Sequence, residues 1–154
     1  MGRELKNLAQ SFVAAFRGVV LVVRHGRNFR IHICMMLYVI IFSLIGNVGK
    51  DNFLRFVLCF GLVMGAEGVN TAIEQLCNSV ALGYDRRIRD IKDISAGAVL
   101  VCAGASAVVG LSVFLSPEVL LKVGERFVAM PYLAVIIALS IPLAVLFIFK
   151  RGMK

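Results

Sequence analysis

Long runs of apolar residues, separated by short polar segments, dominate this chain, and four of the runs predict membrane-spanning helices. A helix needs about 20 mostly apolar residues to cross the hydrocarbon core of a bilayer. The four runs cover residues 31–45, 52–82, 94–115 and 131–149. Glycines at positions 46 and 49 predict a turn after the first run. The second run is longer than a bilayer requires, so one end of its helix should project beyond the hydrocarbon.

Residues 3–26 follow a different pattern, in which apolar positions recur every three or four residues between basic ones. A helix with basic residues and a leucine-phenylalanine face, here Leu5, Leu8, Phe12 and Phe16, is expected to lie at the membrane surface. The predicted fold is therefore an all-α membrane protein. It consists of an N-terminal amphipathic surface helix, three core transmembrane helices and a fourth, C-terminal transmembrane helix.

The composition indicates that lipid is the solvent for most of the chain. Hydrophobic residues make up 60% of the sequence and the mean hydropathy is +0.90, whereas soluble domains are about 45–50% apolar. One membrane domain accounts for nearly all of the sequence. The cysteines lie in apolar runs without C-x-x-C spacing, so we interpret them as buried free thiols rather than zinc ligands or disulfides.

The formal net charge of +8 is best explained by the positive-inside rule. Lysines and arginines cluster before the first run, between the second and third runs, and after the fourth, where Lys150, Arg151 and Lys154 stand. These clusters predict that both termini and the 83–93 loop face the cytoplasm. Nucleic acid is not an expected partner, because the sequence has no soluble basic face with interleaved aromatic residues.

Polar residues concentrate at one place in the second run. Glu67, Asn70, Glu74 and Asn78 are spaced by three, four and four residues, so they share one face of a helix. A carboxylate within the bilayer costs about 2.5–3.5 kcal/mol or more. These groups could serve as hydrogen bonds between helices, but carboxylates suit that task poorly. The alternative is a substrate or cation site, whose oxygen ligands suit a hard ion such as Mg²⁺.

A second polar segment, residues 85–93, follows this helix directly and contains alternating acidic and basic residues. It could be an ordinary cytoplasmic loop that obeys the positive-inside rule. Carboxylates for a metal beside basic donors for phosphates are also the components of a phosphoryl-transfer site. The glycine-rich loops of soluble nucleotide-binding proteins are absent from the sequence, so any nucleotide site is of another type.

Two ordered motifs carry a resemblance to a known family. The first is Glu67-Gly-Val-Asn70-Thr-Ala-Ile-Glu74, and the second is Lys92-Asp93-Ile-Ser-Ala-Gly-Ala-Val-Leu100. Together with residues 27–32, Arg-Asn-Phe-Arg-Ile-His, they resemble the prokaryotic diacylglycerol kinase family, which includes the undecaprenol kinases of Gram-positive bacteria. The resemblance covers about residues 5–115. The Asn-Phe-Arg-Ile-His sequence at residues 28–32 is closer to the undecaprenol kinase branch of the family.

The resemblance implies a homotrimer in the bacterial inner membrane that transfers the γ-phosphate of MgATP to a lipid alcohol, either undecaprenol or diacylglycerol. Residues 1–115 would form the kinase-like domain, and residues 116–154 would add a loop and the last transmembrane helix. By the same analogy Glu67 contacts the lipid hydroxyl as its general base, and Glu74 binds Mg²⁺. Asn70 positions substrate or nucleotide, while Lys92 and Asp93 contact the nucleotide.

The sequence departs from the family pattern at two positions. Gly26 stands where the family usually has a glutamate that helps to bind the metal, and Asn78 stands where it usually has an aspartate. Two alternatives remain open beside the lipid kinase, and the departures motivate the first of them. One is a catalytically weakened member of the same fold that still binds lipid or nucleotide. The other is a small ion-conducting helical protein that uses Glu67 and Glu74 as a relay.

Overall fold

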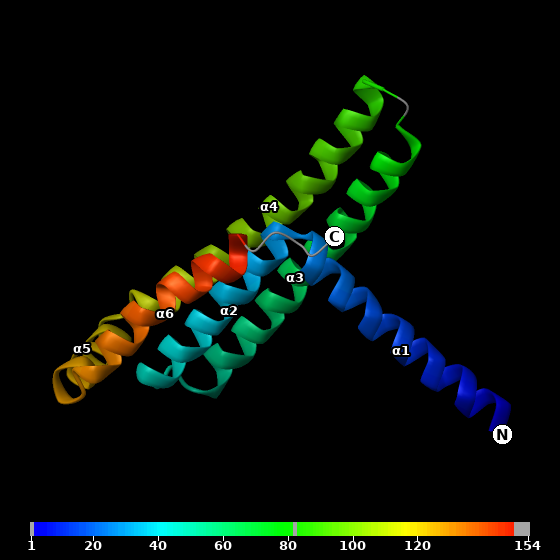
Figure 1. Cartoon of the computed structure of the whole chain (residues 1–154). Helices are drawn as coiled ribbons and strands as arrows, with labels where there is room; N and C mark the ends of the chain where they lie inside the picture. Colours follow the sequence, from blue (N-terminus) through cyan, green and yellow to red (C-terminus); the bar gives the residue numbers. More distant parts are fainter. Residues whose placement is uncertain (1, 82, 150–154) are drawn as a thin grey trace.

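The computed structural model describes residues 2–81 and 83–149, and this portion of the chain is entirely helical apart from short connections (Figure 1). The described helices are α1 (Gly2–His25), α2 (Arg27–Ile45), α3 (Lys50–Val80), α4 (Arg86–Phe114), α5 (Pro117–Ala129) and α6 (Tyr132–Phe149). All except α5 are long and apolar enough to cross a membrane. The predicted all-α membrane fold is confirmed. The basic cluster at residues 150–154 lies outside the described residues.

Helices α3 and α4 form an antiparallel hairpin with the most extensive contact in the molecule. With 31 residues, α3 is about 46 Å long, which exceeds the hydrocarbon thickness of about 30 Å. Figure 1 shows that the α3–α4 turn extends well past the ends of α2 and α6. The predicted projection of the second span is therefore at its C-terminal end, where the polar residues lie.

The expected 83–93 loop is mostly helix. α4 begins at Arg86, because the side chain of Asp85 caps the helix and accepts a hydrogen bond from the Arg87 backbone N–H at 2.7 Å. The charged residues that follow this cap form the first turns of α4, before its apolar portion begins. An exposed pair between Arg89 and Asp93, at 3.7 Å, spans one of these turns.

Helix α1 points away from the other helices (Figure 1). No residue in the most apolar part of α1 is buried against them. It ends at His25, and Gly26 adopts an extended conformation before α2 begins at Arg27. A surface location for α1 remains a prediction, because its length and composition also fit a membrane span.

The loop expected after the third span contains a helix, α5. Its start follows ordinary helix signals: Ser116 precedes the helix, Pro117 occupies its first turn and Glu118 follows. Lys122 Nζ contacts Glu118 Oε1 at 2.6 Å, one turn apart. The amphipathic α5 buries Val119 against the bundle.

The main hydrophobic cluster lies at the end of the bundle remote from the α3–α4 turn. Val48, Phe56, Val113 and Val119 form it, and the rings of Phe56 and Phe114 stack at 5.4 Å. The turn predicted at residues 46–49 is confirmed. Asn47 and Gly49 have φ angles of 47° and 80°, in the left-handed region that favours glycine.

Helix α6 packs on α2, and two polar contacts join these helices. The hydroxyl groups of Tyr38 and Ser140 are 2.9 Å apart. At the other end of α6, the Arg30 guanidinium donates to the backbone oxygen of Phe147 at 3.2 Å. A cation at this position compensates the negative end of the helix dipole of α6.

Candidate functional site

The four polar residues predicted to share a face of α3 differ sharply in burial. Glu67 is 2% exposed and Asn70 is 3% exposed, whereas Glu74 and Asn78 are exposed. Thr71, between them, is also buried. The site therefore has a buried section around Glu67 and Asn70. Its accessible section, around Glu74 and Asn78, lies further along α3 toward the α3–α4 turn.

Asn70 is joined to the neighbouring helix by a side-chain hydrogen bond. The Ser95 hydroxyl on α4 donates to Asn70 Oδ1 at 2.7 Å, and both residues are buried. Ser95 belongs to the second motif but was not predicted to be a site residue. The small polar residue three positions after Lys92 was the available signal, but its partner is 25 residues away in the sequence.

Glu67 carries a buried oxygen that no described residue satisfies. Its Oε2 atom has no hydrogen-bond partner in the described portion of the chain. An unsatisfied buried polar atom costs about 1–3 kcal/mol, and more when the group is charged. Such atoms are rare in native proteins and require an explanation. A substrate hydroxyl or a cation would supply the missing partner.

The second polar segment separates into two regions in the structure. Lys92 Nζ donates to Asn78 Oδ1 at 2.6 Å, which brings the start of α4 to the accessible end of the α3 site. Asp93 instead lies beside Arg89 on the exposed surface of α4. Among the described residues, no hydrogen bond or ion pair joins Lys92 or Asp93 to Glu67.

Gly26, one of the two positions at which the sequence departs from the resembled pattern, is buried against α3. A Cβ built on Gly26 would lie 2.9 Å from the backbone oxygen of Val22 and 3.2 Å from the Phe29 Cβ. It would also lie 3.3 Å from Thr71 Oγ1. The junction between α1 and α2 therefore has no space for a side chain at position 26. An acidic residue there requires the backbone to move.

The carboxylates of this site can bind a magnesium ion only in one way, together with a ligand that the protein does not supply. Among the described residues, no cluster of three or more His, Cys, Asp or Glu side chains could hold a metal. Mg²⁺ usually keeps several waters and binds through one or two carboxylates together with substrate phosphates. Glu74, with Glu67 about two helical turns deeper on the same helix, fits an ion that arrives with a nucleotide. It does not fit an ion caged by protein ligands.

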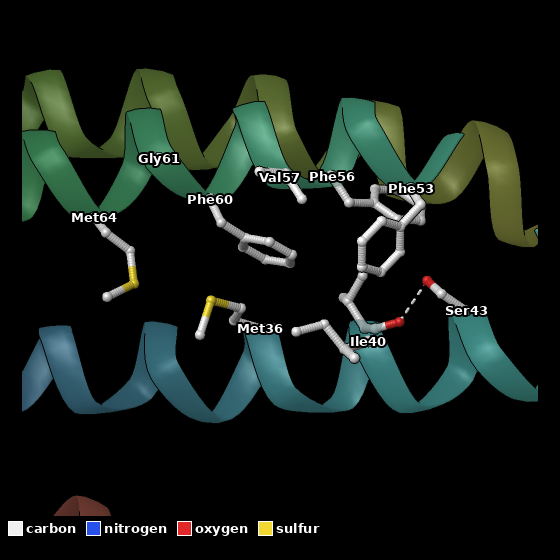
Figure 2. Close-up of a pocket in the computed structure, with 10 residues that line it drawn as sticks. Met36, Ile40, Ser43, Phe53, Phe56, Val57, Phe60, Gly61 and Met64 are labelled. Atoms are coloured by element: carbon white, nitrogen blue, oxygen red, sulfur yellow. Dashed lines mark hydrogen bonds between the residues drawn. The ribbon is translucent and has the colours of Figure 1, made fainter. Parts of the chain in front are cut away.

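An apolar groove lies on the side of Glu67 that is nearer the start of α3, and Met64 is its last lining residue on this helix. It lies between α2 and α3 and has a volume of about 280 Å³ (Figure 2). At one end Ser43 bonds to its own helix, through the Val39 backbone oxygen, and at the other end Met36 faces Met64. Met64 is about one helical turn before Glu67 on α3. The groove therefore ends about one helical turn from the buried carboxyl.

These features define a class of protein: a multi-pass membrane protein with a buried carboxyl and amide in a spanning helix, close to basic residues at the end of that helix. A family model described as prokaryotic diacylglycerol kinase matches residues 13–114. The chain belongs to this family of ATP-dependent lipid kinases. The match ends at the last residue of α4, so α5 and α6 lie beyond it.

Two curated relatives agree with this assignment. The chain is 32% identical over 112 residues to an undecaprenol kinase of Bacillus subtilis, covering 73% of this chain and 91% of the relative. It is 35% identical over 118 residues to a diacylglycerol kinase of Synechocystis, covering 76% and 67% respectively. No solved structure gave a significant match.

Proposed function

We propose that the protein transfers the γ-phosphate of MgATP to the hydroxyl of a membrane lipid alcohol, with undecaprenol preferred over diacylglycerol. The observation that carries this proposal is the buried Glu67 carboxyl, whose Oε2 has no partner among the described residues. The preference for undecaprenol rests on two observations. One is the Asn-Phe-Arg-Ile-His sequence at residues 28–32, and the other is the similarity to the undecaprenol kinase, which covers 91% of that relative.

In the proposed reaction Glu67 takes the proton of the lipid hydroxyl while the hydroxyl oxygen bonds to the γ-phosphorus. The bond between the γ-phosphorus and the bridging oxygen breaks, and its electron pair leaves with ADP. Catalysis of phosphoryl transfer depends mainly on positioning and on stabilisation of charge. Asn70 would position the reacting groups, and Lys92 would contact the phosphates as a cationic donor. Asp93 would contact the nucleotide at the outer edge.

Glu74 is proposed as the carboxylate that binds Mg²⁺, with Glu67 as the nearest second carboxylate on α3. When bound with the nucleotide, the ion would neutralise phosphate charge. The exposure of Glu74 supports this role, since a nucleotide-bound ion must reach its ligand from water. The lipid, in contrast, would approach through the bilayer, and its hydrocarbon chain would lie in the apolar groove between α2 and α3.

The same proposal orients the protein. ATP is a cytoplasmic solute, so the accessible end of the site, at the α3–α4 turn, would face the cytoplasm with both termini. The basic residues Arg86, Arg87 and Arg89 at this end agree with the positive-inside rule. We also propose a homotrimer, by analogy with the family.

The test is phosphate transfer from γ-labelled ATP by the purified full chain in mixed micelles with Mg²⁺, offered undecaprenol and diacylglycerol separately. Labelled undecaprenyl phosphate in excess over labelled phosphatidate is the expected result. The reverse ratio would overturn the substrate preference but not the kinase activity. Absence of both products, from protein that remains folded and oligomeric, would reject the proposed activity.

That last result would favour a second candidate, a weakened family member that binds lipid or nucleotide without efficient turnover. Two observations favour it specifically. Gly26 is packed so closely that no acid can replace it without rearrangement, and Asn78 offers a neutral amide oxygen that already accepts from Lys92. Binding of MgATP without transfer would distinguish this candidate from loss of all function.

A further inference from the structure

The Ser95 hydroxyl differs from the hydroxyls of Ser106 and Ser112 on α4 because it reaches a different helix. Ser95 Oγ lies 2.7 Å from Asn70 Oδ1 on α3, and also 2.9 Å from the backbone oxygen of Lys92. Ser106 and Ser112 donate to backbone oxygens of α4 itself, at 2.8 Å in each case. Bonding to a carbonyl three or four residues earlier is common for serine in helices. Ser95 has one hydroxyl proton, which its two acceptors share, and the shorter of the two contacts is the one to Asn70.

The direction of this hydrogen bond determines which way the Asn70 amide faces. The amide oxygen is only an acceptor, and the amide nitrogen is only a donor. Because Oδ1 accepts from Ser95 on α4, the NH₂ group is the part of the amide that is left to donate to other partners. Asn70 comes three residues after Glu67 on α3, so the two side chains are neighbours on one face of this helix.

We infer that Ser95 is a positioning residue, which holds the Asn70 amide with its N–H groups toward the Glu67 carboxyl. The inference rests on the proposed function of Glu67 and Asn70. In this orientation the amide can donate to the carboxylate. In the reverse orientation, two acceptor oxygens would face each other, which is unfavourable in a poorly solvated site.

The surroundings of Ser95 make its hydroxyl hard to replace. Ser95 and Asn70 line an apolar groove of about 330 Å³ between α3 and α4, whose other lining residues are all apolar. An alanine at position 95 would therefore leave Asn70 Oδ1 without a donor from protein. The same open space leaves room for one extra methyl group, so threonine at position 95 keeps the hydroxyl without crowding.

The first experiment compares transfer by Ser95→Ala, Ser95→Thr and Ser106→Ala, each as the full chain in micelles. Ser106→Ala removes the same hydroxyl from the same helix, without a partner on α3. Ser95→Ala is expected to lower kcat about tenfold, the effect of one net hydrogen bond, with KM for ATP unchanged. Ser95→Thr should recover most of the loss, and Ser106→Ala should match wild type.

A role in helix packing alone gives a different result. It would lower the thermal midpoint of unfolding and leave kcat of the folded protein unchanged. Furthermore, if Ser95 acts through Asn70, then Ser95→Ala should cause no further loss of transfer in an Asn70→Ala background. Equal losses in both backgrounds, or a Thr variant no better than the Ala variant, would overturn the inference.

A second experiment does not depend on transfer, so it separates failure of this inference from failure of the proposed function. The side-chain amide NMR signals of Asn70 are identified by their loss in Asn70→Asp. They should shift or broaden in Ser95→Ala, since the amide can then rotate, and they should keep their positions in Ser106→Ala. Unchanged Asn70 signals in Ser95→Ala would reject the positioning role even if the protein is an active kinase.

Discussion

Gly26 packs directly against Thr71, so that a Cβ on Gly26 would lie 3.3 Å from Thr71 Oγ1 and 2.9 Å from the backbone oxygen of Val22. This relationship joins the start of α2 to the buried section of the site on α3. The junction between α1 and α2 therefore has no space for a side chain at position 26 unless the surrounding atoms move.

The first prediction concerns this junction. Gly26→Ala should destabilise the protein by about 1–3 kcal/mol, because overpacking forces the backbone to shift, and thermal unfolding in micelles measures the change. Gly26→Glu should lose at least as much stability and should not raise the rate of transfer. Gly18→Ala is the matched control, since a Cβ on Gly18 meets nothing within 4 Å. A more active Gly26→Glu would show that the junction rearranges easily.

The second prediction concerns the buried carboxyl. Glu67→Gln should reduce transfer by about 10²- to 10⁴-fold, the usual contribution of a general base, while its size-exclusion profile stays the same as that of wild type. Glu125→Gln makes the same substitution at an exposed position on α5 and should have no effect. Substantial activity in Glu67→Gln would remove this residue from the role of base.

The third prediction concerns the metal. Glu74→Gln should raise the Mg²⁺ concentration required for half-maximal transfer by about tenfold or more, because a charged oxygen ligand is replaced by a neutral one. The measurement is a Mg²⁺ titration at fixed ATP, with metal removal by chelator as the zero point. An identical titration curve for the variant and wild type would exclude Glu74 as a ligand.

The fourth prediction concerns the nucleotide. Lys92→Ala should raise KM for ATP about tenfold, since a cationic donor to phosphate is lost, and KM for the lipid should stay the same. Lys122→Ala is the control, because Lys122 pairs with Glu118 on α5, away from the α3–α4 turn. If both variants change KM for ATP equally, the effect is a general one of surface charge.

The fifth prediction concerns the groove between α2 and α3. Gly61 lines this groove, and a Cβ on it meets nothing within 4 Å, so Gly61→Leu should fold and fill the space. It should raise KM for the lipid at least about tenfold and leave KM for ATP unchanged. Gly104→Leu, on α4 and equally free of contacts, controls for added bulk. A normal lipid KM in Gly61→Leu would place the hydrocarbon chain elsewhere.

Much of the fold was predictable from the sequence, because each element depends on local order. An apolar run long enough to span a bilayer forms a helix in lipid, since every backbone polar group must then be satisfied within the segment. Four of the five long helices and the turn at residues 46–49 follow from such runs and from the glycines between them, whereas α1 follows from its three-to-four periodicity. The amphipathic α5 was not predicted, because a helix of 13 residues is too short to span a bilayer and its sequence lies between two predicted spans.

The sequence by itself also determined which side chains share the polar face of α3, because helical periodicity places Glu67, Asn70, Glu74 and Asn78 together. Their unequal burial was decided by tertiary structure. Which helix covers a given turn, and how closely, depends on packing between segments distant in the sequence. For that reason only the folded chain pairs Asn70 with Ser95, Asn78 with Lys92 and Gly26 with Thr71.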